Sequence, residues 1–193
     1  MHRCGARAEL ITALVLIGSL PALGADLSEK LVPCLSCHGA EGQSQIENVP
    51  SLGAQMASYS VIQLFMFREK MRVADPMNEA AKELTDDELQ SMAAAFAAQP
   101  APKPPDDSGD AARLEQARAL TEQNHCNVCH RPDFSGQQTV PRLAYQREDY
   151  LLKTLREYKS GVRHAYEPIM LEVLQPIDDA QFVEFAYYLS HMR

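Results

Sequence analysis

The 193-residue chain is long enough for one ordinary domain or two small ones, and its 46% hydrophobic content is sufficient for packed cores. Without residues 1–24, 16 Lys and Arg stand against 25 Asp and Glu, a net charge of −9. A chain this acidic does not suit binding to nucleic acid.

Residues 1–24 have the pattern of a signal peptide. Arg3 and Arg7 precede the apolar run Leu10–Leu20, and the small residues around Ala22–Gly24 suit cleavage. The segment predicts export to the periplasm, with an uncleaved amino-terminal anchor as the alternative. No later stretch approaches the roughly 20 apolar residues of a membrane helix.

Helical signals recur along residues 25–98. Asp26–Val32 leads to the first of two cysteine motifs, and Ser60–Lys70 has helical periodicity. Thr85 and Glu88 form a capping box that predicts the start of the last helix of this half. No stretch alternates like a strand, so the sequence predicts an all-α domain.

Residues 99–112 are rich in proline and aspartate, a composition that is unsuited to the interior of a helix or strand. We interpret this segment as a linker. It divides the chain into a first domain over residues 25–98 and a second over 113–193.

The second half repeats the helical pattern of the first. Asp110 is placed to cap a helix that leads to the second cysteine motif. An apolar stripe over 151–158 ends at Gly161, which tolerates the left-handed end of a helix. Asp178 and Gln181 form the capping box of the final helix.

The two halves match each other with a period of 91 to 93 residues. The matched positions are Cys34-Leu35-Ser36-Cys37-His38 with Cys126-Asn127-Val128-Cys129-His130, Pro50 with Pro141, Gln55 with Gln146, Tyr59 with Tyr150, Arg72 with Arg163, and Met77 with Met170. Agreement of so many residue types by chance is implausible, so the sequence predicts two similar domains in tandem.

Each Cys-x-x-Cys-His motif suits covalent attachment of haem. Its two thiols add to the vinyl groups, while the adjacent histidine binds iron on the same face. A thioredoxin-like redox pair and a structural zinc site that combines both motifs are the alternatives. Because an exported Cys-x-x-Cys is normally oxidised unless another group captures both sulfurs, the compartment favours two covalently bound haem c groups.

A sixth iron ligand is needed in each half. The candidates of the second half are Met170, Met192, His125, His164 and His191, and those of the first half are Met56, Met66, Met71, Met77 and Met92. Only Met77 and Met170 are matched by the repeat, while Met66 and Met92 fall on apolar stripes typical of core packing. His125 and His164 have no counterpart and are expected at the surface. Methionine and histidine together leave no open position on the iron, which favours one-electron transfer over catalysis.

Further repeated residues are candidates for supporting roles. Pro50 and Pro141 follow the motif histidines closely enough to return to the haem edge, or they are simple turn residues. The repeated tyrosines and arginines could reach haem carboxylates or form a surface between the domains. They are Tyr59, Arg72, Tyr150 and Arg163.

On these residues the whole mature chain resembles the cytochrome c4 family, exported dihaem proteins made of two class I cytochrome c domains joined by a linker. The resemblance implies proximal ligands His38 and His130, distal ligands Met77 and Met170, and thioether links at Cys34, Cys37, Cys126 and Cys129. It also implies that the carbonyls of Pro50 and Pro141 bind the proximal imidazoles. One departure is Lys70, where the pattern has a glycine such as Gly161, and it puts the loop before Met77 in doubt.

We therefore expect an electron carrier rather than an enzyme. It would pass single electrons from a quinol-oxidising complex (quinol-cytochrome c reductase) or a periplasmic dehydrogenase to a terminal oxidase, with peripheral association with the membrane as an option. The alternative is a dedicated dihaem subunit of a dehydrogenase, such as flavocytochrome c sulfide dehydrogenase. A dihaem peroxidase would need a displaceable ligand, against which the paired methionines speak.

The charges of the two halves differ. Residues 25–98 carry 5 basic and 11 acidic side chains, and residues 113–193 carry 10 and 11. This difference predicts two distinct docking faces. The basic face is expected to contain Arg131, Arg142, Arg147, Arg156 and Arg163.

Overall fold

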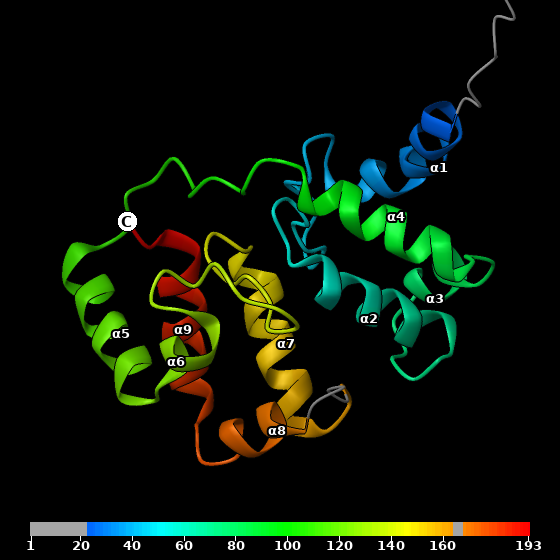
Figure 1. Ribbon diagram of the computed structural model, residues 1–193. Coiled ribbons are helices and arrows are strands. Elements are labelled where there is room, and N and C mark those ends of the chain that lie inside the picture. The colour runs from blue at the N-terminus through cyan, green and yellow to red at the C-terminus, as the bar shows by residue number, and fades with distance from the viewer. Residues whose placement is uncertain (1–22, 164–167) are drawn as a thin grey trace, which may run out of the picture.

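The computed structural model describes residues 23–163 and 168–193 (Figure 1). Residues 1–22, most of the expected signal peptide, and His164 lie outside this part. The first half contains α1 (Leu23–His38), α2 (Ala57–Arg68), α3 (Met77–Ala81) and α4 (Asp86–Ala97). The second half contains α5 (Ala111–Gln123), α6 (Cys126–His130), α7 (Glu148–Ser160), α8 (Ile169–Leu174) and α9 (Asp179–His191). Among these residues there is no β-strand, and the all-α prediction is confirmed.

The helices pack within two separate groups, one for each half of the chain. In the first group α2 packs on α3 and α4, and α4 also contacts α1. In the second group α9 packs on α5 and α7, and α8 contacts α7. Figure 1 shows the two groups side by side, with the connecting segment crossing between α4 and α5. The prediction of two tandem helical domains is therefore confirmed.

The connecting segment is held at both ends. The side-chain amide of Gln43 bonds the backbone of Lys103, donating to its carbonyl over 3.2 Å and accepting from its N–H over 3.3 Å. Near the second domain, the hydroxyl of Tyr187 accepts from the N–H of Asp110 over 2.6 Å. Because α5 begins at Ala111, the last two residues of the expected linker form its first turn.

The predicted capping boxes are present. Thr85 Oγ1 accepts from the N–H of Glu88, whose carboxylate accepts from the N–H of Thr85 over 2.7 Å. Asp178 and Gln181 make the same exchange at the start of α9. Asp110 caps α5, as its position predicted. These side chains satisfy amides that the first turn of a helix leaves unpaired, so they fix where each helix begins.

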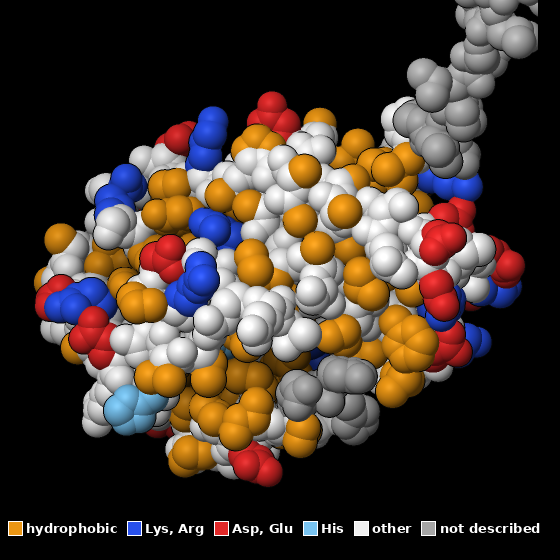
Figure 2. All heavy atoms as spheres, in the orientation of Figure 1, with side chains coloured by type: hydrophobic (Ala, Val, Ile, Leu, Met, Phe, Trp, Pro, Cys, Tyr) orange, Lys and Arg blue, Asp and Glu red, His pale blue; other side chains and the backbone are white. Residues whose placement is uncertain are grey.

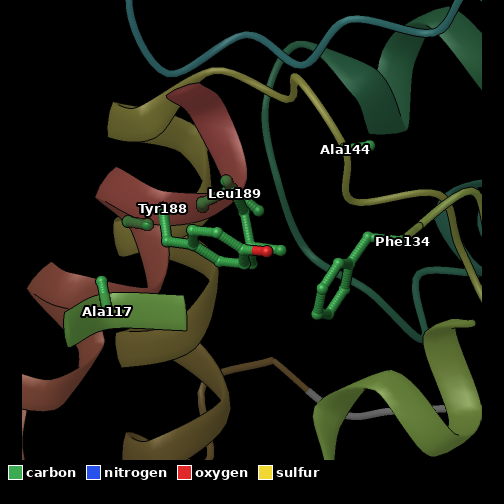
Figure 3. Packing of buried hydrophobic residues seen from close by; sticks show 7 residues of the cluster. Ala117, Phe134, Ala144, Tyr188 and Leu189 are labelled. Atoms are coloured by element: carbon green, nitrogen blue, oxygen red, sulfur yellow. The ribbon is translucent and has the colours of Figure 1, made fainter. Parts of the chain in front are cut away.

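Apolar side chains between the helices form the cores. In the second half, the ring of Phe134 meets Tyr188 edge to face, with centroids 5.9 Å apart, and Figure 3 shows both rings in a cluster that also contains Leu189 and Ala117. A neighbouring cluster joins α8 to α9 through Leu174, Ile177, Phe182 and Phe185. In the first half, Met66 on α2 and Met92 on α4 are buried core residues, as expected.

Neither membrane crossing nor a compact metal-ligand group is found in the described part. Over residues 23–163 and 168–193, no helix has the length and apolar character that a bilayer span requires. Within the same residues, no three His, Cys, Asp or Glu side chains gather as a metal site would need.

The chain reverses in the same way before both repeated arginines. Gly161 follows the end of α7 with φ of 74°, and in the first half Lys70 has φ of 56°. The N–H of Arg72 then bonds the carbonyl of Met66 over 3.0 Å, and that of Arg163 bonds Glu157 over 3.1 Å. The two bonds join equivalent positions, so the replacement of glycine by Lys70 leaves the path of the backbone unchanged.

This reversal predicts opposite effects of two substitutions. Gly161→Ala should lower the free energy of unfolding by about 1 kcal/mol, because a left-handed backbone is strained for any residue with a Cβ. Nothing lies within 4 Å of the added Cβ, so no steric cost is added. Lys70→Gly should raise the free energy of unfolding by about 0.5 kcal/mol, since the relief of strain exceeds the entropy cost of glycine. Chemical denaturation of the holoprotein measures both, and destabilisation by Lys70→Gly would contradict the argument.

Candidate functional site

The two cysteine motifs lie at equivalent positions but on different helices. Cys34, Cys37 and His38 occupy the last turns of α1, whereas the second motif forms the separate helix α6. α6 is separated from α5 by Asn124 and His125, and His125 has φ of 56° and an exposed side chain. None of the four motif cysteines is in a disulfide, so all four thiols are available for covalent attachment.

Both motif histidines are buried and held by a prolyl carbonyl. His38 Nδ1 lies 2.8 Å from the oxygen of Pro50, and His130 Nδ1 lies 2.9 Å from that of Pro141. Because a carbonyl can only accept, the proton is on Nδ1 and the lone pair of Nε2 can bind a metal. Burial lowers the pKa of both imidazoles more than the carbonyls raise it. The neutral form that ligation requires is therefore favoured.

The repeated methionines lie on the short helices α3 and α8. Met77 begins α3 and Met170 is the second residue of α8, and both side chains are half-buried. Exposed apolar side chains stand near each, with Val73 75% exposed and Ile169 54% exposed. Figure 2 shows hydrophobic side chains gathered on the surface of the second half where Figure 1 places α8. Such apolar edges fit the rim of a porphyrin-sized group.

The other candidate ligands have different surroundings. Met66 and Met92 belong to the core of the first half, and Met71 is 50% exposed. Met56 stands at the start of α2, and His191 is buried in α9 beside Tyr187. Met192 packs against the core of the second half.

Hydrogen bonds from side chains to backbone groups hold the two methionine helices in place. The buried amide of Asn78 donates to the carbonyls of Phe67 and Arg72, each over 2.8 Å, and accepts from the N–H of Ala74. In the second half, the ammonium group of Lys159 donates to the carbonyl of Leu174 at the end of α8 over 3.3 Å and to that of Ile177 just beyond it over 2.8 Å. Asn78 has no counterpart in the second half, where Leu171 stands. Lys159 is matched by Arg68, whose Nη1 donates to the carbonyl of Leu84 over 2.8 Å, so a basic residue of α2 or α7 makes this contact in both halves.

The repeated tyrosines and arginines meet across the two halves. Arg163 Nη2 donates to the hydroxyl of Tyr59 over 2.9 Å, and Nη1 donates to Tyr150 over 3.3 Å. Arg72 Nη2 also donates to Tyr150 over 3.3 Å, and its Nη1 donates to Gln63 over 2.7 Å. We call these five residues the arginine–tyrosine cluster. The sequence left two roles open for these residues, binding of haem carboxylates or contact between the domains, and the structure shows the contact between the domains directly.

The arginine–tyrosine cluster concentrates positive charge. Arg72 is 8% exposed and Arg163 is 3% exposed, and no carboxylate of the described residues pairs with either guanidinium. Arg163 Nε is buried without a hydrogen-bond partner. Burial opposes ionisation of Tyr150, but Arg163 and Arg72 outweigh it and lower its pKa to about 7. Buried charge of one sign is stabilised by an anion, so the cluster suits a carboxylate group.

The residues present fit covalently bound haem. Each half offers two thiols, a buried imidazole with Nε2 as its ligand atom, and a thioether on a short helix with an apolar edge. The arginine–tyrosine cluster adds donors for the carboxylates of such a group. The strand–helix context of a thioredoxin-like pair is not found in the described residues.

The expected basic docking face is not formed, and that prediction was wrong. Arg163 is buried in the cluster, and the Nε of Arg142 is buried without a hydrogen-bond partner. Arg147 pairs with Asp149 over 2.7 Å, and Arg156 pairs with Asp179 over 2.6 Å. Only Arg131 among the five is exposed without such a pair. Counting charges along the sequence does not show which arginines are paired. Asp149 is two residues from Arg147, whereas Asp179 reaches Arg156 only through folding.

No protein-family model matches the chain. A cytochrome c4 of Thiocapsa roseopersicina is 31% identical over 166 residues, 81% of this chain and 85% of that protein. A thiosulfate dehydrogenase electron acceptor of Stutzerimonas stutzeri is 30% identical over 82% of this chain and 78% of that protein. The solved cytochrome c4 of Acidithiobacillus ferrooxidans has a TM-score of 0.70 and 29% identity, and the match covers 82% of this chain and 98% of that chain. With this similarity spread over both domains, the chain belongs to the cytochrome c4 family and is an electron carrier with two covalently bound haem c groups.

Proposed function

We propose that the chain is a periplasmic carrier that takes single electrons from a dehydrogenase or a quinol-oxidising complex and delivers them to a terminal oxidase. The observation that carries this proposal is the repeated Cys-x-x-Cys-His motif with its buried, carbonyl-bound imidazole. Residues 1–24 would direct export, and the domains would comprise residues 25–98 and 113–193.

We assign the same role to equivalent residues in the two domains. The thioether links are assigned to Cys34, Cys37, Cys126 and Cys129, and the axial ligands to His38, Met77, His130 and Met170. When bound, the haem iron supplies reversible one-electron chemistry at a potential raised by methionine ligation. The prolyl carbonyls keep the proton on each Nδ1, and the apolar edges keep water from the methionine side.

The arginine–tyrosine cluster is assigned to the haem carboxylates. Its two guanidiniums come from different domains and share the hydroxyl of Tyr150. A carboxylate from either side would therefore be bound by donors of both domains. This arrangement makes the cluster a polar bridge between the two redox sites.

The thiosulfate dehydrogenase electron acceptor among the relatives favours a dehydrogenase as the donor. That relative is named for receiving electrons from one enzyme, and this chain covers most of its length. We therefore propose a periplasmic dehydrogenase of an inorganic sulfur compound as the first donor to test. A quinol-oxidising complex is the second.

The axial assignment predicts the spectra of single variants. Protein purified from the periplasm should contain two covalent haems per chain by the pyridine haemochrome assay and show a methionine-to-iron charge-transfer band. Met77→Ala and Met170→Ala should each remove about half of that band and lower one midpoint potential, because methionine raises the potential. Met66→Leu, a volume-conserving change in the core, should keep the full band. If Met77→Ala kept the full charge-transfer band, Met77 would not be the axial ligand of the first-domain haem.

The charge of the cluster predicts a shift in potential. Arg163→Met should lower the midpoint potentials by about 60 mV or less, at most a tenfold change in the reduction equilibrium. The direction follows because a positive charge near the iron disfavours the ferric state. Arg156→Met removes an exposed arginine that pairs with Asp179 and should leave both potentials unchanged. Equal shifts in the two variants would rule out a special role for the cluster.

The donor proposal is tested by reduction kinetics. The oxidised holoprotein is mixed with a thiosulfate dehydrogenase plus thiosulfate, or with a quinol-cytochrome c reductase plus quinol, and reduction is followed by absorbance. Faster reduction by the dehydrogenase, saturable in the carrier, supports it as the donor. Reduction by the reductase alone would point to the quinol route.

A further inference from the structure

Two buried glutamines reach from each domain into the other. Gln146 belongs to the second half, yet its Oε1 accepts from the N–H of Ser51 over 2.8 Å and its Nε2 donates to the carbonyl of Ser51 over 2.8 Å. Gln55 belongs to the first half and makes the equivalent pair of bonds to Arg142. Its Oε1 accepts from the N–H of Arg142 over 2.7 Å, and its Nε2 donates to the carbonyl of Arg142 over 3.1 Å. Gln55 is 5% exposed and Gln146 is 7% exposed.

The chemistry of these contacts fixes the orientation of both amides. A backbone N–H needs an oxygen opposite it, and a backbone carbonyl needs an N–H. Only one orientation of each glutamine amide satisfies both groups. Each Oε1 also accepts from the backbone N–H of the residue that follows its own glutamine. Gln55 accepts from Met56 at the start of α2, and Gln146 accepts from Arg147 at the start of α7.

The glutamines bind the same peptide groups that hold the proximal histidines. The N–H of Ser51 and the carbonyl of Pro50 belong to one peptide unit, and that carbonyl accepts from His38. The N–H of Arg142 and the carbonyl of Pro141 form the equivalent unit, which accepts from His130. A continuous hydrogen-bonded chain therefore runs from each imidazole, through one peptide, to a glutamine of the opposite domain.

Hydrogen bonds in such a chain strengthen one another. A peptide whose N–H donates to an oxygen carries more negative charge on its carbonyl, so it becomes a better acceptor. A stronger acceptor at Nδ1 increases the basicity of the imidazole, and a more basic ligand stabilises ferric iron and lowers the reduction potential. The glutamine of one domain thus acts on the iron ligand of the other.

We propose that Gln55 and Gln146 are positioning residues that set the two haem potentials crosswise. Gln146 tunes the first-domain haem through Ser51, and Gln55 tunes the second-domain haem through Arg142. The inference rests on the proposed assignment of His38 and His130 as iron ligands.

Two substitutions test the crosswise control. Gln146→Leu removes both bonds to Ser51 and should raise the potential of the first-domain haem. Gln55→Leu should raise that of the second-domain haem. The expected change is twofold to fivefold in the equilibrium constant for reduction, about 20–40 mV for one electron. Spectroelectrochemical titration of the holoprotein measures two redox waves, one for each haem. Met77→His lowers the potential of the first-domain haem only, so it identifies which wave belongs to which domain.

Asp149→Ala is the matched control for a disturbed interface. Asp149 accepts from the N–H of Asn48 across the domains over 3.1 Å, but that amide does not belong to a peptide bound by a proximal histidine. Asp149→Ala should move neither wave, or both equally. In the reduced protein, the NMR signal of the Nδ1 proton of His38 should move upfield in Gln146→Leu, and that of His130 in Gln55→Leu.

The outcomes separate this inference from the proposed function. Two covalent haems with intact methionine bands establish the ligand assignment in each variant before potentials are compared. A larger shift of the opposite domain's haem in both variants supports the proposal. The proposal would be overturned if both haem potentials shifted equally, if only the potential of the haem in the substituted domain shifted, or if the NMR signals of the Nδ1 protons did not move. None of these outcomes would contradict the proposed function as an electron carrier.

Discussion

The hydrogen bond between each buried imidazole and a prolyl carbonyl is the constraint on which the rest of the structure depends. It joins the end of a helix to the loop that follows, so His38 and Pro50 stand in a fixed relation before any cofactor contact is considered. It also orients the N–H of the same peptide, that of Ser51, towards the opposite domain, where Gln146 accepts from it. One bond therefore determines the position of the ligand and the place where the domains meet.

The region between the domains combines features that are individually costly. Two buried guanidiniums face hydroxyl and amide groups and no carboxylate of the described residues, and burial of like charges is unfavourable without an anion. The compensation expected from the haem carboxylates would make cofactor binding and domain docking mutually dependent. Arg163→Met and Gln146→Leu act on different parts of this region, since the first removes charge and the second removes a neutral acceptor.

The sequence predicted the elements that depend on local chemistry or on repetition. Three helix boundaries were predicted correctly because the residue at each is chemically distinctive. The side chains of Thr85 and Asp178 cap the start of a helix, and Gly161, which has no side chain, tolerates the left-handed turn after one. Repetition selected Met77 and Met170, although it did not predict that they lie on short helices. α3 and α8 are too short to show a period, and the latter depends on the distant Lys159.

The sequence could not predict contacts made between the halves. Gln55 and Gln146 were visible as repeated positions, but nothing local shows that each reaches the other domain. The arginines failed for a different reason, because Arg147 and Arg156 pair with carboxylates of their own half, Asp149 at two residues' distance and Asp179 through folding.

The connecting segment over residues 99–110 is anchored to the first domain by Gln43 and to the second by Tyr187. A short tether of this kind makes docking of the domains an intramolecular event, with an effective concentration on the order of millimolar. A small, polar contact surface can then remain closed although the same surface would be too weak to join two free proteins. Because the two domains belong to one chain, neither needs an extensive apolar interface in order to stay beside the other.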